Sequence, residues 1–457
     1  MPNFSKLKII VLLIICYSCS EDAIINSIIE EDTSSTASIT ASTTSTIANT
    51  EVNSFIYEAM NTWYLYKDAQ PLLADDYFES SEEKEAFLNQ NLSPEDFFNL
   101  LKVDEDRFSD LADNINISSK ILNNTHGFSY SLLQINSEII GVVKQVYNES
   151  SAAKAGLARG DFFNKINGIT LTSSNYQSLL TSTSYTLGRV YNKGTNGNYA
   201  FEDRDEITIT VETINESPIV NASILNVNNT QVGYLFYKYF EKEYSNQLNE
   251  VFLNFKNNAV ENFVLDLRYN SGGSEVALLE LASMLTGQFT GEVFCEELYN
   301  QSIQGQIDNG DLSLETKNYF PNILQDGTSI NSLQLSTLYV ITSTATASSS
   351  ELLIKCLEPY INVIVVGDEQ GTVGKSVAVN ILYDAPNYFS TENINTSHNY
   401  ALQMVRKRVV NKEGEMYGDT GVSPDIIATE SFFNLGTIGD FNEPLLHKAL
   451  EAIVGEF

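Results

Sequence analysis

A run of small hydroxylated residues contains the first side chain that could do chemistry. Ser348 is followed three residues later by Glu351, which is the spacing of a capping box at a helix start. The apolar run 338–341 is typical of a buried strand, and the run 351–357 is typical of a helix. Because backbone N–H groups are free at such a turn, it suits a nucleophile with an oxyanion hole. An ordinary capping serine fits the same pattern.

Two Gly-rich stretches also follow strand-like runs. The first, DLRYNSGG, places Gly272 and Gly273 where a backbone can approach a ligand closely and donate N–H groups to an anion. The second, GDEQGTVGKSV, carries Lys375 on a loop after the strand-like run 361–366. It is not a phosphate-binding loop, because it has Glu369 where that motif requires glycine. A plain turn and a solvated lysine remain the simpler interpretations.

Composition limits the function classes. The formal net charge is −33 over 457 residues, and such a field repels nucleic acid and anionic lipid. The length suffices for two or three domains, and the hydrophobic content of 43% is typical of a folded protein. The four cysteines show no metal-ligand spacing, so we predict no metal and no cofactor. Cys295 and Cys356 are expected to be buried thiols, although an oxidising compartment would allow them to pair.

The N-terminus has the features of an export signal. Lys6 and Lys8 precede the apolar run 9–15, which is too short to span a membrane as a helix, and Cys19 follows. This resembles a bacterial lipoprotein signal, in which residues 1–18 are removed and Cys19 receives the lipid that anchors the protein to the membrane. The acidic residues after it resemble the surface-export signal of Bacteroidetes-type lipoproteins, which implies a cell-envelope protein in the periplasm or at the outer-membrane surface. Loss of the two lysines would change the net charge from −33 to −35, and ordinary secretory cleavage is the alternative.

The rest of the chain divides by composition and periodicity. Residues 19–50 are rich in Ser and Thr and predict a flexible tether. Residues 51–125 have apolar positions three and four apart, which indicates a helical domain. Residues 126–215 are typical of strands, with an exposed loop predicted at the Gly- and Asn-rich stretch 188–199. Residues 216–457 alternate strand-like and helical runs, which predicts an α/β sheet with crossover connections.

Residues 150–171, SSAAKAGLARGDFFNKINGITL, resemble the central motif of PDZ domains. In that family the carboxylate at the end of a protein chain binds backbone amides, and the last residues add a strand to the sheet. The resemblance therefore implies a PDZ domain over 126–215 whose partners are unfolded or tail-exposed proteins. Its carboxylate-binding loop would include Gly127, Phe128 and Ser129.

The order of these motifs resembles the C-terminal (tail-specific) processing proteases, which are S41 serine peptidases. The set consists of DLRYNSGG, then TASSSE, then a Gly-Lys after the next strand, and finally GDTGVSPDI at 418–426. The resemblance covers roughly residues 51–445 and implies a multidomain α/β protein. Its parts would be an N-terminal helical domain, a PDZ-like β domain and an S41 protease domain of the ClpP/crotonase type, which hydrolyses peptide bonds without a cofactor.

In that family a Ser–Lys dyad carries the reaction. The resemblance makes Ser348 the nucleophile and Lys375 the general base, with Glu351 as an acid that helps to orient the lysine. A lysine accepts a proton only when neutral, so its pKa must fall from about 10.4 towards about 7–8, which burial can achieve. The negative charge of the chain opposes this fall. The oxyanion hole would be formed by backbone N–H groups, those of Ser349 and of Gly272 or Gly273.

Three features depart from the family pattern. The loop before Lys375 is about two residues longer, and Val379 stands where members often have a polar residue that assists the lysine. Ser349 replaces a common alanine, which leaves Ser350 as an alternative nucleophile. We expect a serine endopeptidase that cuts tail-captured proteins, and the alternative is a catalytically inactive, tail-binding lipoprotein scaffold.

The remaining polar candidates are assigned structural roles. Asp266 and Arg268 are expected to form an ion pair at the end of a buried strand. His126, His398 and His447 lie outside all these motifs, so no Ser-His-Asp triad is predicted.

Overall fold

The computed structural model describes residues 38–112, 122–135, 137–194 and 199–457. The predicted signal 1–18, the predicted lipidation site Cys19 and the first part of the tether lie outside these residues. Helix α1 (Ser38–Trp63) begins within the stretch that the sequence predicts to be a tether.

The chain divides into two compact units. Of the described residues, the first unit contains 122–135, 137–194, 199–223 and 428–457, and the second contains 38–112 and 224–427. The C-terminal segment therefore belongs to the first unit, whereas its sequence pattern predicts that it continues the α/β sheet.

The second unit is built on a six-stranded sheet, which confirms the predicted α/β architecture. Its strand order is β10 (Ile219–Val227), β11 (Thr230–Tyr237), β12 (Asn262–Asp266), β15 (Thr337–Ile341), β16 (Asn362–Gly367) and β19 (Ile426–Ile427). From β11 to β19 all neighbouring strands are parallel. The helices between them are α6 (Ser245–Asn257), α7 (Glu275–Leu285) and α9 (Ser349–Leu357).

Three loops meet at one edge of this sheet, because parallel strands end on the same side. They follow β12, β15 and β16 and comprise residues 267–274, 342–348 and 368–376. The strands before them are largely buried, as their continuous apolar runs predict. The motifs that carry Gly272, Ser348 and Lys375 thus lie together in three adjacent loops.

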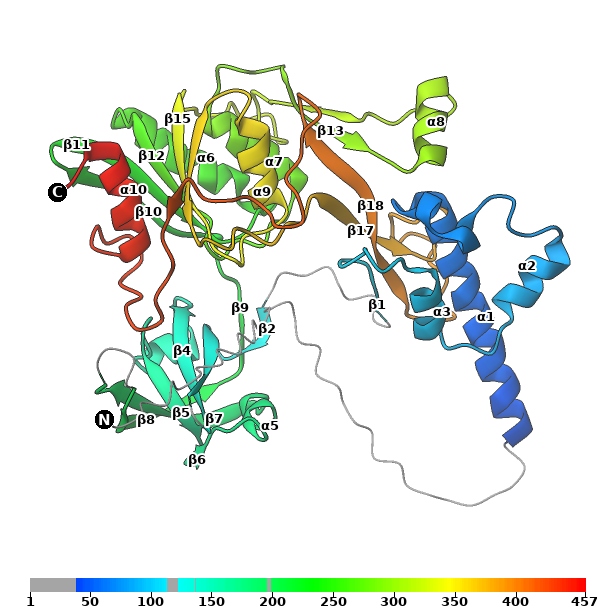
Figure 1. Cartoon of the computed structure of the whole chain (residues 1–457), viewed down its shortest axis with the longest axis horizontal. Coiled ribbons are helices and arrows are strands. Elements are labelled where there is room, and N and C mark those ends of the chain that lie inside the picture. Colours follow the sequence, from blue (N-terminus) through cyan, green and yellow to red (C-terminus); the bar gives the residue numbers. More distant parts are fainter. Residues whose placement is uncertain (1–37, 113–121, 136, 195–198) are drawn as a thin grey trace, which may run out of the picture. The chain divides into compact units, whose positions relative to one another are not determined.

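The N-terminal helices pack against a second, five-stranded sheet in the same unit. The helical region comprises α1, the 3₁₀ turns η1 (Lys67–Ala69) and η2 (Pro71–Leu73), α2 (Ser81–Leu88) and α3 (Pro94–Leu101). The sheet comprises β1 (Asp110–Ala112), β18 (Ala401–Asn411), β13 (Val293–Leu298), β14 (Lys317–Tyr319) and β17 (Val377–Tyr383), and α8 (Gln301–Asn309) connects β13 to β14. Phe55, Met60 and Phe97 share one core with Leu402 and Met404 of β18. Figure 1 shows β18 as a long strand that reaches helices α1 and α3.

The first unit contains a strand-rich fold and the helix α10 (Pro444–Val454). Its main sheet has the order β3 (Phe128–Ile135), β4 (Glu138–Val146), β5 (Phe162–Ile166), β7 (Ser184–Asn192) and β8 (Phe201–Thr210), with β6 (Ile169–Thr170) on β5. A separate pair joins β2 (Leu122–Thr125) to β9 (Glu212–Ile214), and the short helices are α4 (Ser151–Lys154) and α5 (Tyr176–Leu180). Strands β3 and β8 are therefore the edges of the main sheet.

The loop predicted at 188–199 is wrong for residues 188–192, which belong to β7 and pair with β8. Gly188 is explained by packing, because a Cβ atom at this position would lie 2.8 Å from Lys165 Cβ on β5. A glycine that allows close approach between strands has the same sequence signature as a loop glycine.

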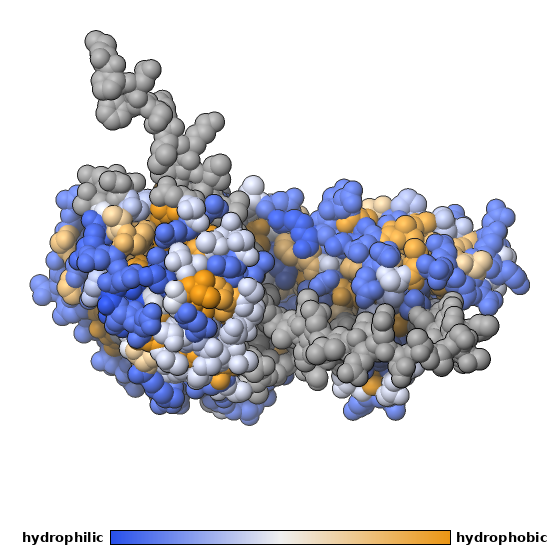
Figure 2. Space-filling model, turned by 90° about the horizontal axis from the view of Figure 1, so that it is seen from below, coloured by the Kyte–Doolittle hydropathy of each residue, from blue (hydrophilic) through white to orange (hydrophobic). Residues whose placement is uncertain are grey.

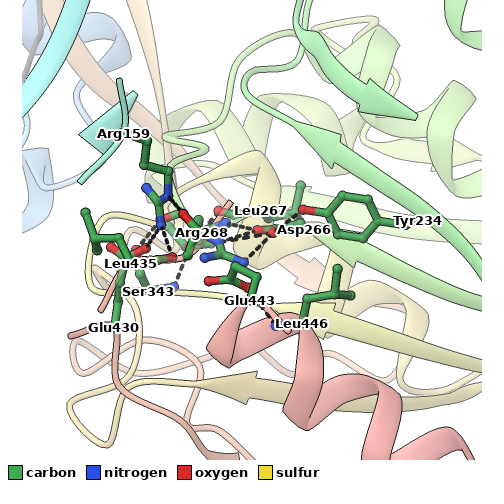
Figure 3. A network of polar contacts seen from close by, with 12 residues as sticks. Arg159, Tyr234, Asp266, Leu267, Arg268, Ser343, Glu430, Leu435, Glu443 and Leu446 are labelled. Carbon is green, nitrogen blue, oxygen red and sulfur yellow. Dashed lines mark hydrogen bonds and ion pairs between the residues drawn. The ribbon is translucent and has the colours of Figure 1, made fainter. Parts of the chain in front are cut away.

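Arg159 holds the C-terminal segment within the first unit (Figure 3). Its guanidinium donates to Glu430 Oε1 at 2.6 Å and to the carbonyl of Leu435 at 3.2 Å. Leu435 also packs in a small core with Leu133 and Val142. The segment after β19 is thereby joined to the strand-rich fold.

The surface agrees with the acidic composition. Figure 2 shows a face on which hydrophilic residues predominate and hydrophobic residues form separate groups. In the described part of the chain, no helix is long and apolar enough to cross a membrane.

Candidate active site

Ser348 occupies a strained position at the turn from β15 into α9. Its backbone has φ +56° and ψ −118°, a region that costs a non-glycine residue about 1–3 kcal/mol. Ser343 and Thr346 fix the preceding loop, because their hydroxyl groups donate to the carbonyls of Arg268 and Leu267 just after β12. These bonds to the segment after β12 stabilise the strained backbone of Ser348. They place the serine at the edge of the sheet, a position that suits a nucleophile.

The carboxylate of Glu351 is fully buried and joins the serine loop to the lysine loop. One oxygen, Oε2, accepts from the backbone N–H of Ser348 at 2.7 Å and from that of Lys375 at 3.0 Å. The other, Oε1, accepts from the N–H of Gly374 at 2.7 Å and from the hydroxyl of Thr372. The nitrogens of Ser348 and Lys375 therefore lie within about 6 Å of each other.

The chain around the predicted closing motif braces the lysine loop. Tyr417 donates its hydroxyl to the carbonyl of Lys375, and the N–H of Val422 donates to Thr372 Oγ1 at 2.8 Å. Burial, and then the carboxylate of Glu351, raise the pKa of Tyr417, so this phenol stays neutral and able to donate.

The loop before Lys375 begins with an exposed turn. Glu369 and Gln370 are exposed within the turn 368–371, which a backbone hydrogen bond of 2.9 Å closes. Beyond the turn, the N–H of Val373 donates to the carbonyl of Thr346 at 3.0 Å. The end of the loop that carries the lysine is therefore tied directly to the serine loop.

The glycine loop approaches the serine closely because Gly272 has no side chain. Its φ is +103°, and a Cβ atom on it would lie 2.7 Å from Ser348 Cβ. Asn270, to which the sequence analysis gave no role, accepts the N–H of Gly272 at 2.8 Å through its side-chain oxygen. By contrast, the N–H groups of Ser349 and Gly273 donate to no acceptor within the described residues.

The three consecutive serines differ in accessibility. Ser350 is fully buried, and its hydroxyl donates to the carbonyl of Asn270 at 3.0 Å. The hydroxyl of Ser349 donates to the carbonyl of Gly273 at 2.9 Å. Ser348 is the one that is partly exposed, so it is the most accessible of the three.

The predicted ion pair between Asp266 and Arg268 is present and fully buried (Figure 3). Arg268 Nη2 lies 2.7 Å from Asp266 Oδ2, and Tyr234 donates its hydroxyl to the same oxygen at 2.8 Å. Removing one partner of such a pair costs about 3–5 kcal/mol. The pair therefore fixes the end of β12, from which the glycine loop starts.

The residues predicted to bind peptide tails lie at the start of β3 in the first unit. Gly127 has φ +85°, its N–H donates to Thr125 Oγ1 at 3.2 Å, and its carbonyl accepts from Ser150 Oγ at 3.0 Å. Phe128 is buried in the core of this unit, and Ser129 follows it along the edge strand. The hydroxyl groups of Thr125 and Ser150 thus bind the turn that precedes the edge strand β3.

The other reactive groups of the described chain do not form a second catalytic cluster. His126, His398 and His447 contact carboxylate or carbonyl oxygens and not serine hydroxyl groups. No three His, Cys, Asp or Glu side chains that could hold a metal ion gather among the residues described. Cys295 and Cys356 are buried free thiols, and the hydrogen bond with Cys295, followed by burial, raises the pKa of Cys356 well above its usual value.

Two residues to which the sequence analysis gave no catalytic role reach the lysine loop. Arg107 Nη2 donates to the carbonyl of Gly374 at 2.9 Å, and Lys375 Nζ lies 5.3 Å from the centre of the Phe108 ring. No local pattern could reveal this contact, because the two hydrogen-bonded residues are 267 positions apart.

Comparisons with known proteins identify a family. The profile of peptidase family S41 matches residues 231–428, and that of the peptidase S41 N-terminal domain matches residues 51–109. The chain is similar to the crystal structure of a protein assigned as an S41 protease from Bacteroides fragilis, at 25% identity and a TM-score of 0.70, over 88% of this chain and 97% of that one. It also matches the photosystem II D1 C-terminal processing protease, at 16% identity and a TM-score of 0.49 over 89% and 97% of the two chains, and mature CPAF, at 13% and 0.47 over 90% and 97%. No curated protein gives a significant match.

Proposed function

The chain belongs to peptidase family S41 and is a serine peptidase, and from this premise we propose that it is an endopeptidase with Ser348 as nucleophile and Lys375 as general base. The observation that supports this pair is the shared carboxylate oxygen of Glu351, which bonds to the backbone of both residues. The flexible four-carbon stem of a lysine can bridge such a separation and bring its amine to the serine hydroxyl.

The reaction proceeds through an acyl-enzyme. Ser348 Oγ attacks the scissile carbonyl carbon while its proton passes to Lys375 Nζ, and the resulting ammonium gives that proton to the leaving amine. A water molecule then attacks the ester carbonyl, loses a proton to the same lysine and releases Ser348.

The oxyanion is stabilised by the N–H groups of Ser349 and Gly273. Ser349 begins α9, so its N–H also carries the positive end of the helix dipole. Gly272 does not donate, because its N–H is held by Asn270, and it contributes by allowing the close approach to Ser348. Removing one donor from an oxyanion hole typically costs about 2.7–4 kcal/mol of transition-state stabilisation.

Substrate tails bind residues 126–215 as a strand added to β3. The two edges of the sheet differ in charge, since β3 has no charged residue and β8 has five in a row at 202–206. Charged edges resist pairing with another strand, whereas uncharged ones accept it. The carboxylate of the tail would then lie at the turn of Gly127, Phe128 and Ser129.

Digestion of an unfolded protein tests the catalytic pair. We expect Ser348→Ala and Lys375→Ala each to lose at least about a thousandfold in kcat/KM. The matched controls Ser350→Ala and Lys355→Ala should remain active, because Ser350 bonds only to a backbone carbonyl and Lys355 pairs with Glu358 and Glu415. Equal digestion by all variants contradicts the proposal. A wild type that an active-serine probe does not label would favour the inactive tail-binding scaffold.

Peptides with modified ends test tail capture separately. Replacing the terminal carboxylate with an amide should raise KM about tenfold and leave kcat nearly unchanged, because the change affects recognition and not chemistry. Identical KM values for the acid and the amide contradict capture through the carboxylate.

A further inference from the structure

The loop 106–109, between α3 and β1, lies against the lysine loop. Arg107 Nη2 donates to the carbonyl of Gly374 at 2.9 Å. The guanidinium carbon of Arg107 lies 4.9 Å from the centre of the Phe108 ring, and Lys375 Nζ lies 5.3 Å from the same centre. The two cationic groups are therefore within about 10 Å of each other.

This loop is held in place by its own buried acid. The carboxylate of Asp106, which is 3% exposed, accepts from the hydroxyl of Tyr64 at 2.7 Å and from the N–H groups of Phe108 and Ser109 at 3.0 and 2.9 Å. Ser109 Oγ in turn accepts from the N–H of Val405 on β18 at 2.8 Å. The position of Arg107 is thus set by the fold, although its side chain is exposed.

We propose that Arg107 is a positioning residue for Lys375, which holds the lysine loop against α9 and disfavours the ammonium form of the lysine. Gly374 shows the first part of this role, because its N–H is held by Glu351 on α9 and its carbonyl by Arg107. The peptide plane that leads into Lys375 is itself held on both sides, because Arg107 binds the carbonyl of Gly374 and Glu351 Oε2 accepts from the N–H of Lys375 at 3.0 Å. The inference rests on the proposed role of Lys375 as general base.

The second part of the role follows from the charges nearby. The charged or titratable groups on the elements packed against the lysine loop are Glu351 on α9, Tyr417 and Asp419 in the closing motif region, Arg408 opposite Val377 on β18, and Asp106 with Arg107. The carboxylates favour a protonated lysine, and so does the face of the Phe108 ring. Within the described part of the chain, the cations on these elements that bond to the lysine loop or lie opposite Val377 and Ala378 are Arg107, Arg408 and Lys407, and Lys407 is paired with Glu275 and Glu297. Of the three, Arg107 has its hydrogen bond to the lysine loop.

The pH dependence of kcat/KM for an unfolded substrate tests this inference. The rate rises with pH as Lys375 loses its proton, so removal of a nearby positive charge must move the midpoint to higher pH. We expect Arg107→Gln to raise the midpoint by about half to one pH unit, which lowers kcat/KM about three- to tenfold below the midpoint and restores it above. Arg107→Lys keeps the charge and should keep the midpoint of the wild type.

Lys102→Gln is the matched control. It removes one positive charge from the same region, where Lys102 Nζ lies over the ring of Phe98 at 5.6 Å, and it should leave the midpoint unchanged. An Arg107→Gln midpoint equal to that of the wild type overturns the inference, and so does an equal loss of kcat/KM at every pH. These results differ from a failure of the proposed function, which would appear as undiminished digestion by Ser348→Ala.

Discussion

Glu351→Gln should separate Ser348 and Lys375, the proposed catalytic pair, without removing either of them. In the wild type, four donors converge on the Glu351 carboxylate, three from the backbone and one from Thr372. Glutamine keeps one acceptor oxygen, and its amide NH₂ would face one pair of these donors. The variant therefore loses about two hydrogen bonds to a charged acceptor.

The magnitude follows from the burial and number of these bonds. A hydrogen bond to a charged group contributes about 1.5–3 kcal/mol, so the loss of two lowers the free energy of unfolding by about 3–6 kcal/mol. The same loss releases the backbone of Ser348 or that of Lys375, and a displacement of about 1 Å costs about a hundredfold in rate. We expect kcat/KM to fall at least about a hundredfold while KM changes little.

Denaturant unfolding tests the predicted loss of unfolding free energy, and kinetics on the same preparation test the predicted loss of kcat/KM. Glu280→Gln is the control, because Glu280 on α7 is also buried and accepts from Ser245 and from the N–H of Gln325, away from the serine and lysine loops. Glu280→Gln should lower the free energy of unfolding but keep kcat/KM, provided that the assay is run without denaturant, where the variant is still folded. If Glu351→Gln retains kcat/KM within about threefold, the idea that this carboxylate positions the pair is refuted.

Three further predictions concern other parts of the structure. Gly272→Ala should abolish turnover, because its Cβ would lie 2.7 Å from Ser348 Cβ, whereas Gly168→Ala, with a similar positive φ but open space around it, should stay active in the same digestion assay. Although burial opposes the shift, Lys407 holds the pKa of Glu297 below its usual value, so Glu297→Gln should lose about 3 kcal/mol of unfolding free energy at pH 7. A carboxyl with a lowered pKa stabilises the fold above the pKa of the unfolded state, so in acid denaturation series this difference should shrink as the pH falls below about 4.5. Cys356 and its neighbouring thiol should resist alkylation until the protein is unfolded, because burial and a raised pKa suppress the thiolate; rapid native-state modification by mass spectrometry would contradict this.

Local patterns predicted the turn at Ser348 because its determinants are adjacent in the chain. An apolar strand, a short polar loop and Glu351 three residues after the serine specify the turn, and the Glu351 side chain accepts from the N–H of Ser348. The glycines at 272 and 273 were placed correctly in a loop after β12 for the same reason. Which of their N–H groups is engaged depends on the side chain of Asn270, and a sequence pattern gives no such geometry.

Contacts between distant segments were beyond prediction from a single sequence. The bond from Arg107 to Gly374 depends on how the N-terminal helices pack on β18, which no local periodicity encodes. The assignment of the C-terminal segment to the first unit depends on Arg159 and on the packing of Leu435. Gly188 is another example. It lies in a strand that packs closely against Lys165, although its local composition predicts a loop.

The pairing of β1 with β18 has a consequence for the order in which the protein is made. The segment 106–112 leaves the ribosome early, but its partners on β18, including Val405 and Gln403, are synthesised about 300 residues later. The bond between Arg107 and Gly374 must wait for the same reason. A nascent chain therefore exposes Ser348 before the strand that anchors the loop beside Lys375 exists. Contact order would thus delay the proposed Ser348–Lys375 activity until almost the whole chain has emerged.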